Sequence, residues 1–98
     1  MNPSASGMLG ILNRAKLLAF GPAVEGSLKK AHLLLLALDA SERTKKELCT
    51  KARCPIEYVS TKAELGAPLG RPELSAVAVL SKKAAASLLG KLQKGETQ

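Results

Sequence analysis

The sequence predicts an α/β domain whose central sheet is covered by helices on both faces. Short apolar runs alternate along the chain with stretches in which apolar side chains recur at helical spacing. The longest apolar run, residues 33–38, has only six residues, whereas a helix that spans a bilayer needs about 20. A short run of this kind is typical of a strand that is buried on both faces.

Length and composition predict a single domain. The chain has 98 residues and is 46% hydrophobic, which is enough for one core and too little for two. Phe20 and Tyr58 are the only aromatic residues, so the core must consist of leucine, valine, isoleucine and alanine. We expect the domain to cover residues 8–93, between flexible tails at residues 1–7 and 94–98.

The first elements follow from apolar spacing and from turn residues. Residues 8–15 carry apolar side chains at i, i+3, i+4 and i+7 and predict an amphipathic helix. Residues 17–20 predict a short strand that ends at a Gly-Pro turn. Pro22 suits the first turn of a helix over residues 23–30, which Gly26 weakens by about 1 kcal/mol relative to alanine.

The strand at residues 33–38 leads into a polar turn and a basic helix. Ser41 is placed to accept hydrogen bonds from the first free N–H groups of that helix. Within the helix, Glu42 and Lys46, and likewise Glu47 and Lys51, have the i,i+4 spacing of ion pairs that contribute about 0.3 kcal/mol each.

The second half repeats this alternation. Residues 56–59 predict a strand, and Thr61 with Glu64 forms a capping-box pattern that opens a short helix ending near a proline. A loop over residues 69–74 leads to a buried strand at residues 76–80. Ser81 then opens a last helix with a regular apolar stripe.

Charge favours a polyanionic partner. Fifteen lysines and arginines against eight acidic residues give a formal charge of +7, which favours nucleic acid before a membrane surface. A solvated basic surface that only improves solubility is the alternative. Two aromatic residues cannot build the stacking platform of a single-strand binder. The sequence therefore predicts recognition of folded RNA through phosphates and backbone groups, with no DNA and no membrane partner.

Catalytic and metal-binding patterns are weak. Residues 21–26 have the glycine spacing of a phosphate-binding loop, but Ser27 stands where the lysine should be. His32 is the only histidine and suggests no catalytic triad. Cys49 and Cys54 with one histidine fall short of the four ligands of a structural zinc site. We expect a non-enzymatic cytoplasmic protein with reduced thiols, no metal and no cofactor.

Candidate RNA-binding residues are glycines, polar residues and one leucine in or next to the loops that follow the strands, together with cations that would surround them. They are Arg14, Lys16, Gly21, Glu25, Lys29, Lys30, Asp39, Ser41, Arg43, Gly70, Arg71 and Leu74.

An ordered set of motifs resembles a known family. The set comprises GILNRAK at residues 10–16, the apolar strand into DAS at residues 39–41, ELG at residues 64–66, LGR at residues 69–71 and AVAVL at residues 76–80. It is similar to the kink-turn-binding ribosomal protein superfamily, in its small bacterial YlxQ-like branch. The resemblance covers about residues 8–92.

The resemblance implies a fold and a function. The fold would be a three-layer α/β/α sandwich with a small mixed sheet. The function would be binding of sharply kinked RNA, ribosomal or other, by a ribosomal or ribosome-associated protein of translation. The helix after Gly21 would dock against the G·A pairs of the kink, while the loop at residues 70–75 would cover an extruded nucleotide.

The chain departs from the family pattern after Gly21. Ala23 and Val24 occupy the positions of an Asn-Glu pair, and Ser27 occupies that of a lysine. Two alternatives therefore stand beside RNA binding. One is a protein–protein adaptor on the same fold that has lost kink-turn recognition, and the other is an accessory domain like those attached to RNA methyltransferases.

Overall fold

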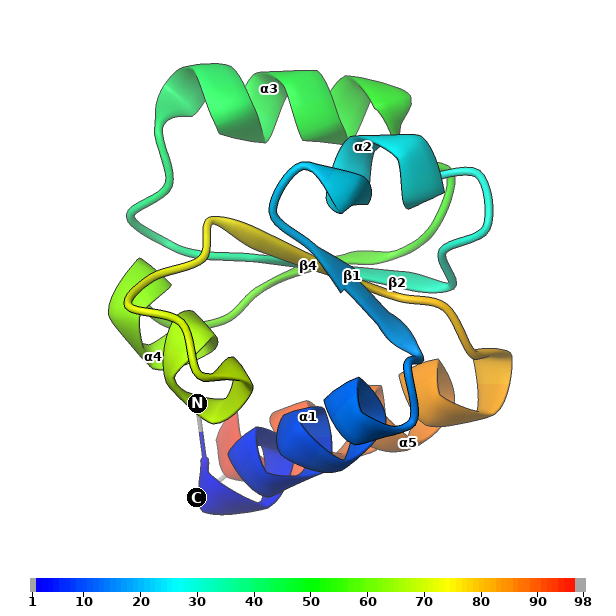
Figure 1. Ribbon diagram of the computed structural model, residues 1–98, viewed down its shortest axis with the longest axis vertical. Helices are drawn as coiled ribbons and strands as arrows, with labels where there is room; N and C mark the ends of the chain where they lie inside the picture. The colour runs from blue at the N-terminus through cyan, green and yellow to red at the C-terminus, as the bar shows by residue number, and fades with distance from the viewer. Residues whose placement is uncertain (1, 97–98) are drawn as a thin grey trace.

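The protein is built in three layers around a four-stranded mixed sheet (Figure 1). The computed structural model describes residues 2–96, with side chains described through residue 92. The strands lie in the order β1-β4-β2-β3, and β4 runs antiparallel to both of its neighbours while β2 and β3 are parallel. The strands are β1 (Leu18–Phe20), β2 (Leu33–Leu36), β3 (Ile56–Tyr58) and β4 (Ala76–Val79).

Helices cover both faces of this sheet (Figure 1), which confirms the predicted α/β/α sandwich. Two of them, α2 and α3, lie on one face, and α1, α4 and α5 lie on the other. Their bounds are α1 (Pro3–Arg14), α2 (Ala23–Ser27), α3 (Glu42–Lys51), α4 (Lys62–Gly66) with the 3-10 turn η1 (Ala67–Leu69), and α5 (Lys82–Glu96).

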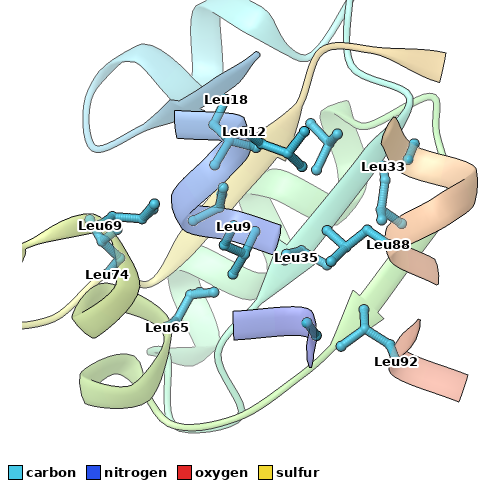
Figure 2. Packing of buried hydrophobic residues seen from close by; sticks show 14 of the residues in the cluster. Leu9, Leu12, Leu18, Leu33, Leu35, Leu65, Leu69, Leu74, Leu88 and Leu92 are labelled. Atoms are coloured by element: carbon cyan, nitrogen blue, oxygen red, sulfur yellow. The ribbon is translucent and has the colours of Figure 1, made fainter. Parts of the chain in front are cut away.

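The central strand β2 divides the core into two clusters. Successive side chains of a strand point to opposite faces, so Leu33 and Leu35 pack toward α1 and α5, while Leu34 and Leu36 pack toward α2 and α3. Figure 2 shows Leu35 facing Leu88 across the first cluster. All four leucines of β2 are at most 1% exposed, so a strand buried on both faces is confirmed for residues 33–36. The predicted extension to residue 38 is wrong, because the strand ends at Leu36 and Leu38 is 56% exposed.

The ends of the chain are more helical than the sequence analysis expects. Residues 3–7, assigned there to a flexible tail, form the first turns of α1. Asn2 accepts a hydrogen bond from the Ala5 N–H at 2.8 Å, and Pro3 suits the first helical position. At the other end α5 continues to Glu96, so residues 94–96 are also helical; residues 97–98 lie outside the described part.

Two further expectations are wrong in detail. The second helix ends at Ser27 instead of residue 30, and the N–H of Lys30 closes a turn on the Ser27 carbonyl at 3.0 Å. The i,i+4 pairs predicted in α3 are replaced by others: Arg43 pairs with Glu47, and Lys51 reaches Glu25 of α2. The predicted caps Ser41, Thr61 and Ser81 each accept a helix N–H at 3.2 Å.

Strand direction sorts the loops onto two edges of the sheet. The carboxyl ends of β1, β2 and β3 meet the amino end of β4, because Phe20 pairs with Val77 and Leu36 pairs with both Ala76 and Tyr58. We call this side, residues 20–25, 37–47, 59–64 and 70–75, the carboxyl edge. The opposite side, residues 14–17, 28–32, 52–55 and 80–83, is the amino edge, which lies at the right of Figure 1.

Candidate nucleic-acid interface

The structure divides the predicted RNA-binding residues between the two edges. The carboxyl edge holds Gly21, Glu25, Asp39, Ser41, Arg43, Gly70, Arg71 and Leu74. The amino edge holds Arg14, Lys16, Lys29 and Lys30. The expectation that Lys29 and Lys30 surround the loop at Gly21 is therefore wrong, because α2 carries the chain back to the start of β2 before it reaches them. Lys29 and Lys30 precede β2, whereas Gly21 follows β1, and the two strands point the same way because both run antiparallel to β4.

A cleft of about 400 Å³ opens on the carboxyl edge. Its walls are the turn at residues 21–22 with the start of α2, one side of α3, and the segment at residues 73–76. Gly21, Glu25 and Leu74 were predicted as site residues, and the cleft brings them together. Thr44 and Glu47 of α3 also line it and were not among the predicted site residues, whereas Ser75 belongs to the loop at residues 70–75 that the family resemblance implied.

The loop at residues 70–75 is held in a fixed shape beside the cleft. Gly70 has a φ of +70°, a conformation that L side chains rarely adopt. The Arg71 N–H donates to the Gly66 carbonyl, and the Leu74 N–H donates to the Lys62 carbonyl, each at 3.0 Å. A Cβ at Gly66 would lie 2.8 Å from the Arg71 oxygen, so only glycine lets the loop approach this closely.

Arg71 connects the loop to the end of β1. Its guanidinium lies 5.2 Å from the centroid of the Phe20 ring, within the range of a cation–π contact. Arg71 is exposed and forms no ion pair with the side chains that the structure describes. Its donors are therefore open to solvent, in the same loop as the cleft-lining Glu73 and Leu74, and a guanidinium in this state can bind a phosphate.

Asp39 and Ser41 are engaged by backbone groups. Asp39 Oδ1 accepts a hydrogen bond from the Lys62 N–H at 2.7 Å, which joins the turn after β2 to the start of α4. Ser41 caps α3 and also donates to the Thr44 hydroxyl oxygen at 2.9 Å. These contacts give both residues a defined role in shaping the carboxyl edge.

The carboxyl edge is close to neutral. Five cations lie in its segments, at positions 43, 45, 46, 62 and 71, and six anions at positions 25, 39, 42, 47, 64 and 73, which leaves a formal charge of −1. The Glu25 carboxylate accepts a hydrogen bond from Lys51 and raises the pKa of that lysine. A hydrogen bond from the Ser60 hydroxyl lowers the pKa of Glu64. The carboxyl edge therefore carries many charged side chains, but their positive and negative charges nearly cancel.

The described residues contain neither a metal-binding cluster nor a membrane-spanning helix, and their two cysteines are free. Cys49 and Cys54 are free, and Cys49 Sγ lies 3.5 Å from the Tyr58 hydroxyl. This contact raises the pKa of Tyr58, and burial raises that of Cys54. Within residues 2–96 no group of three or more His, Cys, Asp or Glu side chains is placed to hold a metal ion. Nor is any helix in that range both long and apolar enough to cross a membrane.

Comparisons with known proteins agree with this fold. The sequence profile of the ribosomal protein L7Ae/L30e/S12e/Gadd45 family matches residues 25–89, about two thirds of the chain. A solved protein of unknown function from Bacillus halodurans superposes with a TM-score of 0.84 at 24% identity, covering 94% of this chain and 99% of its own. A 15.5kD RNA binding protein from Giardia lamblia superposes with a TM-score of 0.69 at 14% identity, covering 96% and 92%. Curated protein sequences gave no significant match.

Proposed function

The chain belongs to the ribosomal protein L7Ae/L30e/S12e/Gadd45 family, and on this premise we propose that it is a non-catalytic RNA-binding protein that recognises kinked RNA. The observation that carries the proposal is the cleft between the turn at residues 21–22, α3 and the segment at residues 73–76. The solved relative from Giardia lamblia, an RNA binding protein by name, adds support because it shares the fold over nearly the whole chain. Association with the ribosome in the cytoplasm is part of the proposal.

The cleft has the size and chemistry for one unstacked nucleotide. Its volume of about 400 Å³ lies in the range of small-ligand pockets. Pro22, Val24 and Leu74 offer apolar contact to a base, while Ser75 and Glu25 offer polar groups to its edge. Sharply kinked RNA exposes such a base, whereas a regular helix keeps every base stacked.

Recognition at this edge depends on shape more than on charge. With a formal charge of −1, the carboxyl edge gains little from counterion release, and Arg71 supplies one phosphate contact beside the cleft. The fixed loop and the positive φ of Gly21 and Gly70 instead present a preformed surface. A preformed surface distinguishes kinked RNA from straight RNA because it does not adapt to either.

Fluorescence anisotropy with two RNA hairpins tests the proposal. One hairpin contains a kink-turn, and the other has its G·A pairs replaced by Watson–Crick pairs. We expect a preference for the kink-turn of at least about tenfold, equivalent to 1.4 kcal/mol. Arg71→Ala should weaken kink-turn binding. It should also lower the slope of log K against log salt by about 1, the value expected for the loss of one phosphate contact. Lys91→Ala removes the same charge from α5 and serves as the matched control.

Two results would contradict the proposal in different ways. Equal affinity for both hairpins would remove kink recognition and leave a basic α/β domain. No binding to either hairpin at low salt would favour the adaptor, which the shortness of α2, with five residues, supports. A pull-down from nuclease-treated lysate would test the adaptor. A protein that binds directly would stay bound after nuclease treatment, whereas a protein held only through RNA would be lost. Cosedimentation with ribosomal subunits tests the ribosomal association.

A further inference from the structure

The basic charge of this protein is concentrated on the amino edge, away from the cleft. Seven of the fifteen lysines and arginines lie in its segments, and no acidic residue does. The remaining eight basic residues equal the eight acidic residues, so the amino edge accounts for the whole formal charge of +7. All seven side chains are exposed, and none forms an ion pair with another described side chain.

Backbone hydrogen bonds bring the four segments of the amino edge side by side. The Leu80 N–H donates to the Leu17 carbonyl at 2.8 Å, and the His32 N–H donates to the Val79 carbonyl at 2.8 Å. On the other side of β2, the Leu34 N–H donates to the Pro55 carbonyl at 2.9 Å. The cations next to these residues are therefore spread along the whole width of the four-stranded sheet, which is on the order of 15 Å.

The seven cations come from both helix layers. Arg14, Lys16, Lys82 and Lys83 flank the layer of α1 and α5. Lys29, Lys30 and Arg53 flank the layer of α2 and α3. Figure 1 shows the sheet between the two helix layers. The cations of the amino edge therefore fall in two groups, which we call the two basic rows, one on each side of the strand ends.

Helix dipoles explain only a small part of this charge. Three helices end at the amino edge and one begins there, and a helix end carries roughly half an elementary charge. Their sum is about −1, against seven positive side chains. Most of the positive charge therefore has no partner within the described part of the protein.

We propose that the amino edge is a second RNA-binding surface, which contacts the phosphate backbone of a helical RNA segment. Phosphates line both sides of the shallow minor groove of an RNA helix, and the two basic rows match that arrangement. Stacked single strands are a poor fit, because Phe20 and Tyr58 lie at the carboxyl ends of their strands and no aromatic residue lies on the amino edge.

The second surface contacts a different segment of RNA from the cleft. The two edges lie at opposite ends of the strands, in a molecule that measures 30 × 26 × 25 Å. An RNA kink held at the carboxyl edge leaves the amino edge free for another helix. The protein would then join two RNA segments, one recognised by shape and one held by charge. The ligand class of this inference rests on the proposed function.

Binding of a plain RNA duplex of about 20 base pairs tests the surface, because such a duplex offers no kink to the cleft. The variants Lys29→Ala/Lys30→Ala and Lys82→Ala/Lys83→Ala each remove two exposed cations from one row. Each should weaken duplex binding on the order of tenfold and lower the slope of log K against log salt by about 2. The control Lys46→Ala/Lys91→Ala removes equal charge elsewhere and should change both quantities little.

A native gel shows whether both surfaces are occupied together. A labelled kink-turn hairpin bound to the wild-type protein should shift again when duplex is added, and the variant that lacks all four lysines should lose this second shift. The kink-turn preference itself should stay the same in that variant. If the wild type shows no kink preference but the duplex results stand, the proposed function fails and the second surface remains.

Three outcomes would overturn the second surface. The control variant could weaken duplex binding as much as the amino-edge variants, which would make the effect one of net charge. The amino-edge variants could bind duplex as the wild type does. Phosphatidylserine vesicles could bind the wild-type protein through the same lysines while duplex RNA does not, which would assign the edge to an anionic lipid surface.

Discussion

The carboxyl edge of the sheet carries five basic and six acidic side chains, whereas the amino edge carries seven basic side chains and no acidic one. The carboxyl edge also holds the 400 Å³ cleft and the glycines of positive φ at positions 21 and 70. The amino edge has a smaller hollow of about 260 Å³ between His32 and α5. One edge therefore has the features of shape recognition, and the other has those of charge recognition.

This difference changes the meaning of the net charge. A charge of +7 on a small RNA-binding protein suggests that the cations surround the specific site. Here the cleft that we propose as the nucleotide site lies in nearly neutral surroundings, and the excess charge lies at the other end of the strands. Specificity and electrostatic affinity can then be altered separately by substitution, and the following predictions use that separation.

The largest effect should come from Leu35→Asp, which should unfold the domain and so remove both proposed binding surfaces. Leu35 is fully buried in the central strand between Glu57 of β3 and Val77 of β4. An unpaired carboxylate there carries a desolvation penalty of several kcal/mol, comparable to the stability of a domain of this size. We expect no cooperative unfolding transition by circular dichroism and no binding to either RNA. A transition like that of the wild type would contradict the described core.

The architecture follows from the sequence, but the separation of the two edges required the structure. The six-residue apolar run and the alternation of patterns predict a sheet covered on both faces, because a strand with helices on both sides, such as β2 or β4, must be apolar on both faces. The sequence does not show that β4 runs antiparallel between β1 and β2. Without this topology, Lys29 and Lys30 could be placed beside Gly21, from which the structure separates them.

The start of the first helix has a local signal in the sequence. Asn2 followed by Pro3 is a helix-start signal, and the structure begins α1 there.

The end of α2 at Ser27 is harder to predict, because the turn to β2 is set by tertiary contacts. Val24 and Leu28 pack on the sheet in the same cluster as Leu48 of α3, and this packing fixes the short helix against β4.

Gly66→Ala should damage the carboxyl edge alone. The added Cβ would lie 2.8 Å from the Arg71 carbonyl oxygen and 3.0 Å from Glu73 Cα, so the loop at residues 70–75 must move. Overpacking of this kind lowers the free energy of unfolding by about 1–3 kcal/mol. We expect loss of the kink-turn preference with unchanged duplex affinity, measured by urea unfolding and anisotropy.

Gly10→Ala is the matched control for Gly66→Ala. The added Cβ would lie 3.6 Å from the Pro68 oxygen, which is an ordinary van der Waals contact. Position 10 lies within α1, where alanine stabilises the helix relative to glycine. It should leave both RNA affinities unchanged. A Gly66→Ala protein that retains the kink-turn preference would show that the loop takes no part in recognition.

Gly21→Ala and Gly26→Ala should change stability in opposite directions. Gly21 has a φ of +65°, and an L residue in this conformation is destabilised by roughly 1–2 kcal/mol. Gly26 lies within α2, where alanine stabilises a helix by about 1 kcal/mol. Neither Cβ would meet another atom within 4 Å, so backbone conformation alone decides the sign.

Chemical denaturation of both variants checks this pair, and RNA binding extends it. Gly21→Ala should reduce the kink-turn preference because this turn forms one wall of the cleft. Duplex binding should be unchanged. Gly26→Ala should preserve both. Equal stability of the two variants would mean that the turn after β1 does not need a positive φ.

The smallest effect concerns the ion pair between Glu25 and Lys51 at the side of the cleft. The Glu25 carboxylate raises the pKa of Lys51 above its ordinary value of 10.5, so the folded protein holds this proton more tightly than the unfolded chain does. The resulting stabilisation is complete below pH 10.5 and is lost as the pH rises through the raised value. Urea unfolding on both sides of that pH should show a steeper loss of stability for the wild type than for Glu25→Gln.

Lys51→Met should show the same shallow dependence as Glu25→Gln, since each variant removes the same pair. At neutral pH both variants should be close to the wild type in stability, because the pair is exposed to solvent. Glu25→Gln also removes a negative charge that lines the cleft, so it should strengthen kink-turn binding and leave duplex binding unchanged. If duplex binding rises by the same factor, charge at one edge acts on the other, and the two surfaces are not independent.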